Sequence, residues 1–311
     1  GRPPDENAFS SAYVVPHGAT TVVGPERSAR LHYWNRFYDS PMAILEDIST
    51  QHCIVERDDH VVTMTLNRPE KKNALSSDML AGLVMAYEYI DAEPGVHCAI
   101  LTGAGGSFCS GMDLVSMGQE PTDPRVKAVM SRGDKPHWKA LLRDYRLSKP
   151  LVAAVEGYAV AGGTEILQGT DIRVAAETAI FGVWEAKRGL FPLGGSACRL
   201  PRQIPYTQAM DVLLACRPIT ALEAQQMGLI GRVVPEGQAL AVARAVAAQV
   251  AACAPLSTQA ILRAWRETEH MNDYDAMQHQ DAIGLEVFAS EDAQEGPRAF
   301  AEKRPAVFKG R

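Results

Sequence analysis

The chain has 311 residues, 46% of them hydrophobic, and carries a formal net charge of −6 at pH 7. This apolar content can fill one large core or two modest ones. The acidic balance argues against a protein that coats nucleic acid, so an anionic ligand would need a local cluster of Lys and Arg.

Six cysteines are scattered along the chain, and no two of them form a C-x-x-C pair. This spacing argues against a zinc ribbon or a dense disulfide framework and favours a reducing compartment. No run of 18 apolar residues is present, and the N-terminus lacks a basic start followed by an apolar block. We therefore expect a cytoplasmic protein without a membrane-inserted segment.

Residues 1–47 are rich in Pro, Gly, Ser and charge, with an aromatic patch at residues 33–38, and are interpreted as an extension of unknown role. Regular structure is expected to begin near Gln51. Residues 52–56 and 61–66 flank a charged turn, which is typical of a β-hairpin. Apolar residues recur at helical spacing between Leu80 and Ile90, which predicts a helix over residues 77–91.

Short apolar runs predict buried strands at residues 98–102, 150–155 and 172–176, with a helical segment ending near residue 148. Strands that alternate with helices indicate an α/β core, assigned to residues 48–250. Thr220 begins a capping box whose helix ends at Gly228, and residues 229–234 are a candidate strand. From Gln238 onward the chain is expected to be helical except at Pro255 and Gly296-Pro297, and residues 251–311 are predicted to form a helical oligomerisation or lid region.

Two glycine-containing turns, at residues 103–114 and 157–165, each follow a predicted strand. Glycine permits positive φ angles and close approach of a ligand, and a helix that begins at such a turn presents free N–H groups to negative charge. A dinucleotide fingerprint is excluded because Phe108 stands where the third glycine is needed. A P-loop is excluded because Gly163 replaces the phosphate-binding lysine, and no G-x-S-x-G motif occurs.

Glu165 follows the second turn directly, and Glu185 follows a short strand that ends near Gly182. Both lie in apolar surroundings, where burial would raise the pKa of at least one carboxyl. Two close carboxyls with separated pKa values suit acid–base chemistry on a water molecule. Taken singly, each glutamate could equally be a helix N-terminal charge or one half of a loop ion pair.

From about residue 51 to residue 311 the chain resembles the crotonase superfamily, and within it the enoyl-CoA hydratases. The marks occur in family order, at residues 67–69, 73–75, 108–114, 157–171, 181–185, 189–195 and 300–304. The resemblance implies a spiral of ββα repeats, with a C-terminal helical region that builds a homotrimer or a hexamer made of two trimers.

The resemblance also implies the chemistry of the site. The backbone N–H groups of Met112 and Gly162 correspond to the oxyanion-hole donors, and Glu165 and Glu185 to the two hydratase acids. The family often has Ala where Met112 stands, so this side chain is expected to shape the pocket. Glu165 would activate water and Glu185 would deliver a proton to the α-carbon. No metal or redox cofactor is expected. Coenzyme A counts as part of the substrate and not as a cofactor.

Further residues are candidates for contact with the acyl-CoA substrate. Lys71 and Lys72 either face the coenzyme A phosphates or are merely solvated, and Phe300 and Lys303 match positions that reach the coenzyme from a neighbouring subunit. The remaining candidates lie within the matched motifs or next to Glu185 and are Ala74, Ser110, Asp113 and Trp184. Residues 115–147 are expected to border the pocket for the acyl chain.

Two other functions compete with hydration. A Δ3,Δ2-enoyl-CoA isomerase, or another acyl-CoA enzyme of the superfamily, would need one base and the oxyanion hole. A scaffold or RNA-binding relative would keep the fold without turnover, but no basic stripe supports binding of nucleic acid. Retention of both glutamates favours the hydratase.

Overall fold

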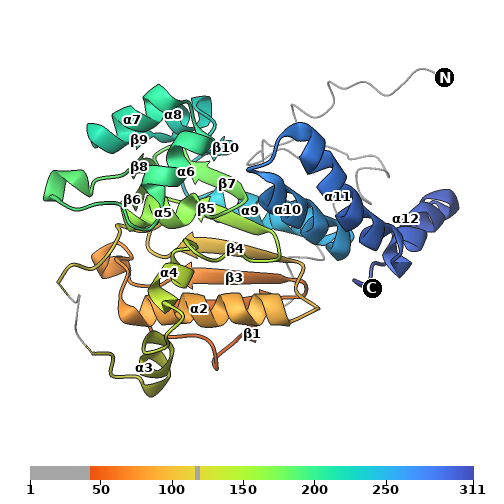
Figure 1. Ribbon diagram of the computed structural model, residues 1–311. Helices are drawn as coiled ribbons and strands as arrows, with labels where there is room; N and C mark the ends of the chain where they lie inside the picture. Colours follow the sequence, from red (N-terminus) through yellow and green to blue (C-terminus); the bar gives the residue numbers. More distant parts are fainter. Residues whose placement is uncertain (1–42, 116–119) are drawn as a thin grey trace, which may run out of the picture. The chain divides into compact units, whose positions relative to one another are not determined.

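The computed structural model describes residues 43–115 and 120–311, so the predicted aromatic patch at residues 33–38 lies outside the described residues. A seven-stranded sheet has the strand order β1–β2–β3–β4–β5–β7–β10 (Figure 1). The pairs β1/β2 and β2/β3 are antiparallel, and the remaining neighbours are parallel. These strands are Ala43–Ile44, Cys53–Asp58, Val61–Leu66, Cys98–Gly103, Leu151–Val155, Ile172–Ala176 and Arg232–Val234.

A second sheet holds three short strands, β6 (Tyr158–Val160), β8 (Ile180–Gly182) and β9 (Ile219–Thr220), in the order β6–β8–β9. Helices of the core are α2 (Ser77–Ala92), α3 (Pro124–Met130), α4 (Pro136–Ala140), α5 (Gly162–Leu167), α6 (Ser196–Gln203), α7 (Tyr206–Leu214), α8 (Ala221–Gln226) and α9 (Ala239–Ala251). The C-terminal helices are α10 (Pro255–Thr268), α11 (Asp273–Phe288) and α12 (Glu291–Glu302).

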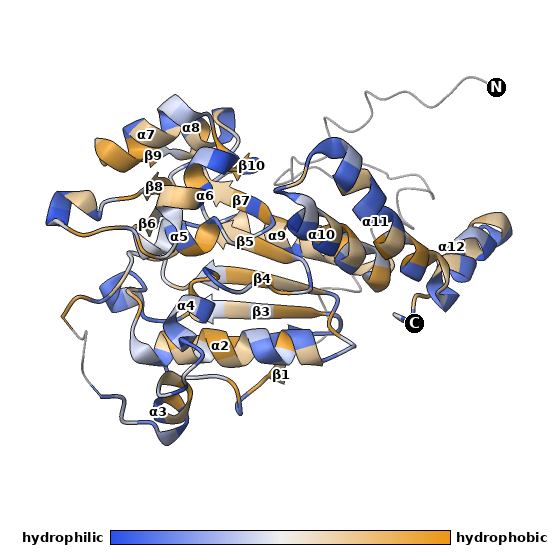
Figure 2. Ribbon diagram, viewed as in Figure 1, coloured by the Kyte–Doolittle hydropathy of each residue, from blue (hydrophilic) through white to orange (hydrophobic). Residues whose placement is uncertain are grey.

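Alternate residues of β4 pack into different hydrophobic clusters, because successive side chains of a strand point to opposite faces of the sheet. Ala99 and Leu101 join the cluster that includes the apolar face of α2. Cys98 and Ile100 join a smaller cluster that includes residues of α9. Figure 2 shows the corresponding strands as mainly hydrophobic. The large sheet is thus covered on both faces, as parallel strands require.

Two strands followed by a helix recur along the chain, as β2–β3–α2, β5–β6–α5 and β7–β8–α6. This order confirms the predicted hairpin, the three predicted buried strands and the predicted helix over residues 77–91. The capping box at Thr220 is also confirmed, because its side chain accepts from Glu223 N and the Glu223 carboxylate accepts from Thr220 N. Strands β1, β6 and β9 and helices α6 and α7 were not among the predicted elements. The expectation that regular structure begins near Gln51 is wrong, because β1 already pairs with β2 at Ala43 and Ile44.

The predicted break at Gly296-Pro297 is wrong, because both residues lie inside α12. Pro297 is exposed, so its ring meets no tightly packed neighbour on the outer side of the helix. Because Pro297 has no N–H, the Ala293 carbonyl lacks its helical hydrogen bond, but Ala293 is partly exposed and water can reach it. Pro255, by contrast, opens α10 at its first position, where no backbone donor is needed.

Among the described residues, no single helix has both the length and the apolar content needed to cross a membrane. Helices α9 and α10 meet that test only when taken together, and the chain bends by 102° between them.

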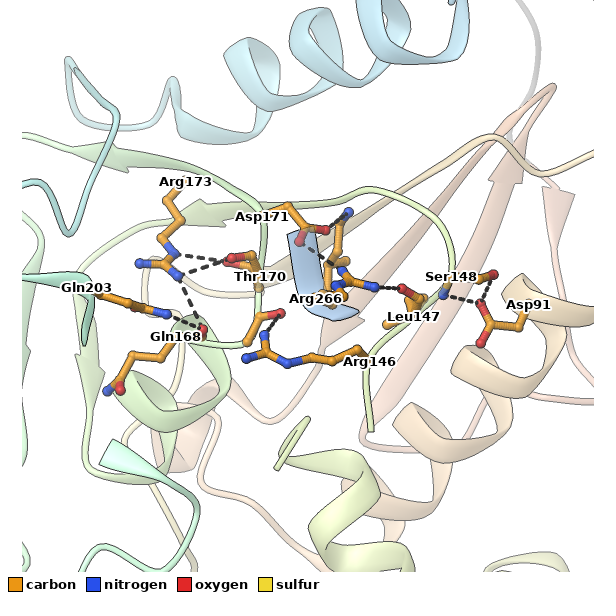
Figure 3. Close-up of polar contacts among 12 residues, drawn as sticks. Asp91, Arg146, Leu147, Ser148, Gln168, Thr170, Asp171, Arg173, Gln203 and Arg266 are labelled. Atoms are coloured by element: carbon orange, nitrogen blue, oxygen red, sulfur yellow. Dashed lines mark hydrogen bonds and ion pairs between the residues drawn. The ribbon is translucent and has the colours of Figure 1, made fainter. Parts of the chain in front are cut away.

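The C-terminal end of α5 is held by side chains from three other segments (Figure 3). Arg173 of β7 donates to the carbonyl oxygens of Gln168 and Thr170 at 3.2 and 3.1 Å, and Gln203 of α6 donates to Gln168 O at 2.9 Å. Arg146 donates to Gly169 O at 3.1 Å. Guanidinium and amide groups therefore satisfy the carbonyls that a helix leaves open at its C-terminus.

We expect Arg173→Met to lower the free energy of unfolding by about 2 kcal/mol, because the Thr170 and Leu229 carbonyls would lose their guanidinium donor. Urea unfolding measures this change. Arg202→Met, at an exposed position of α6, is the matched control and should stay within about 0.5 kcal/mol of the parent protein. If the two variants unfold alike, Arg173 does not anchor α5.

Candidate active site

The two glycine-containing turns lie side by side in the structure. Cys109 and Ala159 form a parallel bridge in which Cys109 N donates to Tyr158 O at 2.8 Å and Val160 N donates to Cys109 O at 3.0 Å. Gly163 packs so closely on Cys109 that a methyl group there would lie 2.4 Å from the Cys109 carbonyl oxygen. Only glycine permits this approach of the second turn to the first.

The backbone N–H of Met112 points away from Leu75, the residue with which its segment is paired. Leu75 N donates to Gly111 O at 2.8 Å, and Asp113 N donates to Leu75 O at 3.1 Å. Because successive peptide groups of an extended segment point in opposite directions, the Met112 N–H faces away from Leu75. A methyl group added at Gly162 would lie 3.6 Å from Met112 N, so the two residues are neighbours.

The amide of Gly162 is the first of helix α5, so it has no acceptor within that helix. The preceding residue, Ala161, has φ 51° and ψ −122°, a conformation that a residue with a side chain rarely adopts and that costs about 1–3 kcal/mol. Ala161 N donates to Gly182 O at 2.7 Å, which holds this turn against β8. In the described part of the chain, neither the Met112 nor the Gly162 amide donates to another protein group.

Glu165 lies in the first turn of α5 with only 4% of its surface exposed. Its Oε1 accepts the backbone N–H of Ser196, the first residue of α6, at 3.2 Å. Burial raises the pKa of Glu165 to about 7, and the negative charge of Glu185 acts in the same direction. The carboxyl can therefore gain or lose a proton near neutral pH.

Glu185 follows β8 and also has a raised pKa, chiefly because it is buried. Backbone N–H groups of Trp184 and of Glu185 itself oppose this shift. Its Oε2 is buried and has no hydrogen-bond partner among the described residues. A buried carboxyl oxygen without a partner is costly, and it is satisfied when a polar ligand reaches it.

Glu165, Glu185, Met112 and Gly162 all border one cavity of about 740 Å³, which is within the usual size range of ligand pockets. Seven of the predicted site residues line it, namely Lys72, Ser110, Met112, Gly162, Glu165, Trp184 and Glu185. The other lining residues are Leu114, His137, Trp138, Leu141, Tyr158, Val160, Ala161, Arg188, Leu190, Phe191, Leu193 and Gly194.

The other five predicted residues do not line this cavity. Asp113 forms an ion pair of 2.6 Å with Arg68, and the Ala74 carbonyl accepts from the same guanidinium at 3.4 Å. Lys71 is exposed, and its carbonyl accepts from Ser110 Oγ at 3.2 Å.

Phe300 lies on α12 and is 87% exposed, and Lys303 is exposed at the end of the same helix. Within one chain these two residues therefore do not take part in the cavity.

The cavity residues that were not singled out from the sequence include Tyr158 and His137. The Lys72 ammonium lies 4.4 Å from the centre of the Tyr158 ring, within the range of a cation–π contact. Tyr158 stands inside the second glycine turn, and this position is the signal that the sequence offered. His137 lies within residues 115–147, which were expected to border the pocket, and gave no signal of its own.

Among the described residues, no group of three or more His, Cys, Asp or Glu side chains is placed to hold a metal ion.

Residues 56–311 match the family model described as enoyl-CoA hydratase/isomerase. The chain is 54% identical over 273 residues to enoyl-CoA hydratase EchA19 of Mycobacterium tuberculosis, covering 87% of this chain and 100% of that protein. It is 36% identical over 258 residues to (E)-benzylidenesuccinyl-CoA hydratase of Thauera aromatica, covering 82% and 98%.

The fold also resembles solved structures of enoyl-CoA hydratases and related proteins. A putative enoyl-CoA hydratase/isomerase from Mycobacterium abscessus superposes with a TM-score of 0.74 at 42% identity, covering 84% of this chain and all of the other. An enoyl-CoA hydratase from Mycobacterium tuberculosis superposes with a TM-score of 0.76 at 38% identity and with the same coverage. The predicted fold class is thereby confirmed.

The raised pKa of Glu165 predicts a pH-dependent stability. Between about pH 4.5 and pH 7 the folded protein holds this proton more tightly than the unfolded chain, so ionisation of Glu165 destabilises the fold as the pH rises through this window. Relative to the parent protein, Glu165→Gln should gain about 2.5 kcal/mol in free energy of unfolding between pH 5 and pH 8. Urea unfolding at the two pH values measures this gain, and a pH-independent difference would contradict it.

Proposed function

The chain belongs to the enoyl-CoA hydratase/isomerase family and is an enzyme of the hydro-lyase class, and from that membership we propose the reaction that its cavity performs. Water adds across the 2,3 double bond of a 2-enoyl-CoA thioester and gives a 3-hydroxyacyl-CoA. One observation carries this proposal: two residues whose backbone amides have no acceptor and two glutamates, one buried and one half-buried, border the same cavity.

The amides of Met112 and Gly162 are proposed to bind the thioester carbonyl oxygen. As water attacks the β-carbon, negative charge moves onto this oxygen and an enolate forms. Hydrogen bonds that strengthen during this step lower the barrier, and a single donor of this kind is worth about 3 kcal/mol. The strained turn at Ala161 supports this role, because it fixes the peptide group that carries the Gly162 N–H before substrate arrives.

The two glutamates are proposed to hold the attacking water between them. Glu165, as the carboxylate, takes one proton from the water while the water oxygen bonds to the β-carbon. Glu185, as the acid, delivers its proton to the α-carbon. The raised pKa of each group supports proton transfer near neutral pH. The division into base and acid follows from the family resemblance and not from the pKa shifts, because the negative charge of Glu185 itself raises the pKa of Glu165. In this reaction the groups of the protein and one water molecule perform every step, without a cofactor.

Coenzyme A is proposed to enter past Lys72 and Tyr158, where a cationic side chain and an aromatic ring meet at the cavity. Ser110, Ala74, Asp113 and Lys71 belong to the segments that form this entrance and are proposed to shape it. The Arg68–Asp113 ion pair supports a shaping role, because it ties the two segments together.

A trimer, or a hexamer of two trimers, is proposed as the working form, with Phe300 and Lys303 reaching the coenzyme of a neighbouring subunit. Large apolar side chains exposed on α10 and α11 support this proposal, because such a surface commonly marks a protein interface. They are Ile261, Trp265, Tyr274, Met277, Leu285 and Phe288. A cytoplasmic site of action is proposed from the described cysteines, all of which are free thiols.

Substitution of the two acids tests the reaction. Glu165→Gln and Glu185→Gln should each lower kcat for hydration of 2-butenoyl-CoA by at least about 100-fold, because each removes one proton transfer. The decrease in enoyl-thioester absorbance measures hydration, and Δ3 to Δ2 isomerisation is followed in parallel. A Glu165→Gln variant that loses hydration but isomerises 3-enoyl-CoA at the parental rate would favour the isomerase.

Substitution of Gly162 tests the oxyanion hole. In Gly162→Ala the new methyl group would lie 3.1 Å from the flexible end of the Leu75 side chain and 3.6 Å from Met112 N, beside the proposed position of the carbonyl oxygen. We expect kcat to fall about 100-fold while the protein remains folded. Gly133→Ala is the matched control, because a methyl group there meets no atom within 4 Å. Parental kcat in both variants would exclude a carbonyl bound between these amides.

A further inference from the structure

The polar side chains that line the cavity fall into three groups. Lys72, Ser110 and Tyr158 form the first, and the two glutamates with Arg188 form the second. The third is a single imidazole, that of His137 on α4, and its neighbours on this wall, Trp138 and Leu141, are largely apolar. The proposed function gives roles to the first group and to the two glutamates, and it leaves Arg188 and His137 without one.

The imidazole of His137 is half-buried, is held in place by its neighbours and makes no hydrogen bond to another described residue. Its ring centre lies 4.4 Å from that of Trp138, and the Arg143 guanidinium lies 4.5 Å from the Trp138 ring. Helix α4 is itself anchored, because the Tyr87 hydroxyl donates to Ala140 O at 3.2 Å. No described residue hydrogen bonds to either ring nitrogen of His137.

The charge state of His137 is set by its surroundings. Partial burial lowers its pKa, and the positive charges of Arg143 and Lys135 act in the same direction, while Asp144 opposes them weakly. The ring is therefore neutral at neutral pH, with one nitrogen that donates and one that accepts. Such a group selects an uncharged hydroxyl or carbonyl rather than an anion.

The order of groups along an acyl-CoA indicates which part of the substrate meets His137. This inference rests on the proposed function, in which the coenzyme passes Lys72 and the reacting carbons lie at the amides and glutamates. The molecule is linear, so its acyl chain must extend along the walls that remain. Those walls are α4 and the apolar segment of Leu190, Phe191 and Leu193.

We propose that His137 is a specificity-determining residue, which favours 2-enoyl-CoA thioesters whose acyl chain carries a hydroxyl or carbonyl oxygen beyond the reacting carbons. The oxygen satisfies an imidazole nitrogen that otherwise faces an apolar chain. An analogue without this oxygen leaves the nitrogen unpaired, and a site that hydrogen-bonds a substrate group disfavours such an analogue. For a partly exposed neutral pair the expected preference is about 3- to 10-fold in kcat/KM.

The test compares two series of 2-decenoyl-CoA thioesters, one with a hydroxyl and the other with a methyl branch at the same carbon, moved from C6 to C9. The methyl series matches the hydroxyl series in shape, so the ratio of kcat/KM within each pair isolates the hydrogen bond. Unsubstituted 2-decenoyl-CoA reports hydration itself. The enzymes are the full parent chain, His137→Phe, His137→Gln and the control His270→Phe, which changes an exposed histidine outside the cavity.

The parent chain and His270→Phe should prefer the hydroxyl by about 3- to 10-fold at one or two positions. In His137→Phe, which keeps a ring beside Trp138, this ratio should fall to about 1, and His137→Gln should restore part of it. The same ratio in His137→Phe as in the parent, or no preference in the parent, overturns the role of His137. Failure of the parent to hydrate any of these thioesters overturns the proposed function as well.

Discussion

The proposed site depends on two neighbouring peptide N–H groups, those of Met112 and Gly162, which donate to no other group in the described part of the protein. Such donors are rarely left without a partner at a buried site. Here the surrounding backbone maintains the arrangement. The Leu75 N–H donates to the Gly111 carbonyl, which belongs to the same peptide group as the Met112 N–H, and the Leu75 carbonyl accepts from Asp113 N. On the other side, α5 begins at Gly162 directly after the strained Ala161.

Burial of the two glutamates also lowers the stability of the folded protein. Glu165 is almost fully buried, and one oxygen of Glu185 is buried without a partner. Both features oppose folding, and the two hydrophobic clusters on either side of the large sheet supply the stabilisation that offsets them. Arg173, Gln203 and Arg146 fix the far end of α5, so the helix that carries Glu165 is held at both ends. A helix held in this way keeps an acid in position when its charge changes.

Much of this arrangement could be predicted from the sequence, because it depends on local patterns. The strands around Leu101 and Val155 are apolar runs bounded by turns, and the helix after Ser76 has regular apolar spacing. Glu165 and Gly162 were assigned from the family motif that surrounds them, and Met112 from the motif of the first turn.

Other features depend on contacts that no local pattern encodes. β6 is only three residues long, and it exists because it pairs with β8 across the second sheet. Ala161 adopts a positive φ because the turns on both sides enforce it, although its residue type favours a negative value. His137 reaches the cavity because α4 packs against α2 and places residues from distant parts of the sequence on a common wall.

A crystal structure of the full chain with a bound 3-hydroxyacyl-CoA tests the central claim most directly. The account predicts that the thioester oxygen lies within about 3.1 Å of both Met112 N and Gly162 N, at hydrogen-bonding distance. It also predicts that the 3-hydroxyl oxygen lies between the carboxyls of Glu165 and Glu185. A thioester oxygen bound away from these amides, or a 3-hydroxyl group that contacts neither glutamate, would contradict it.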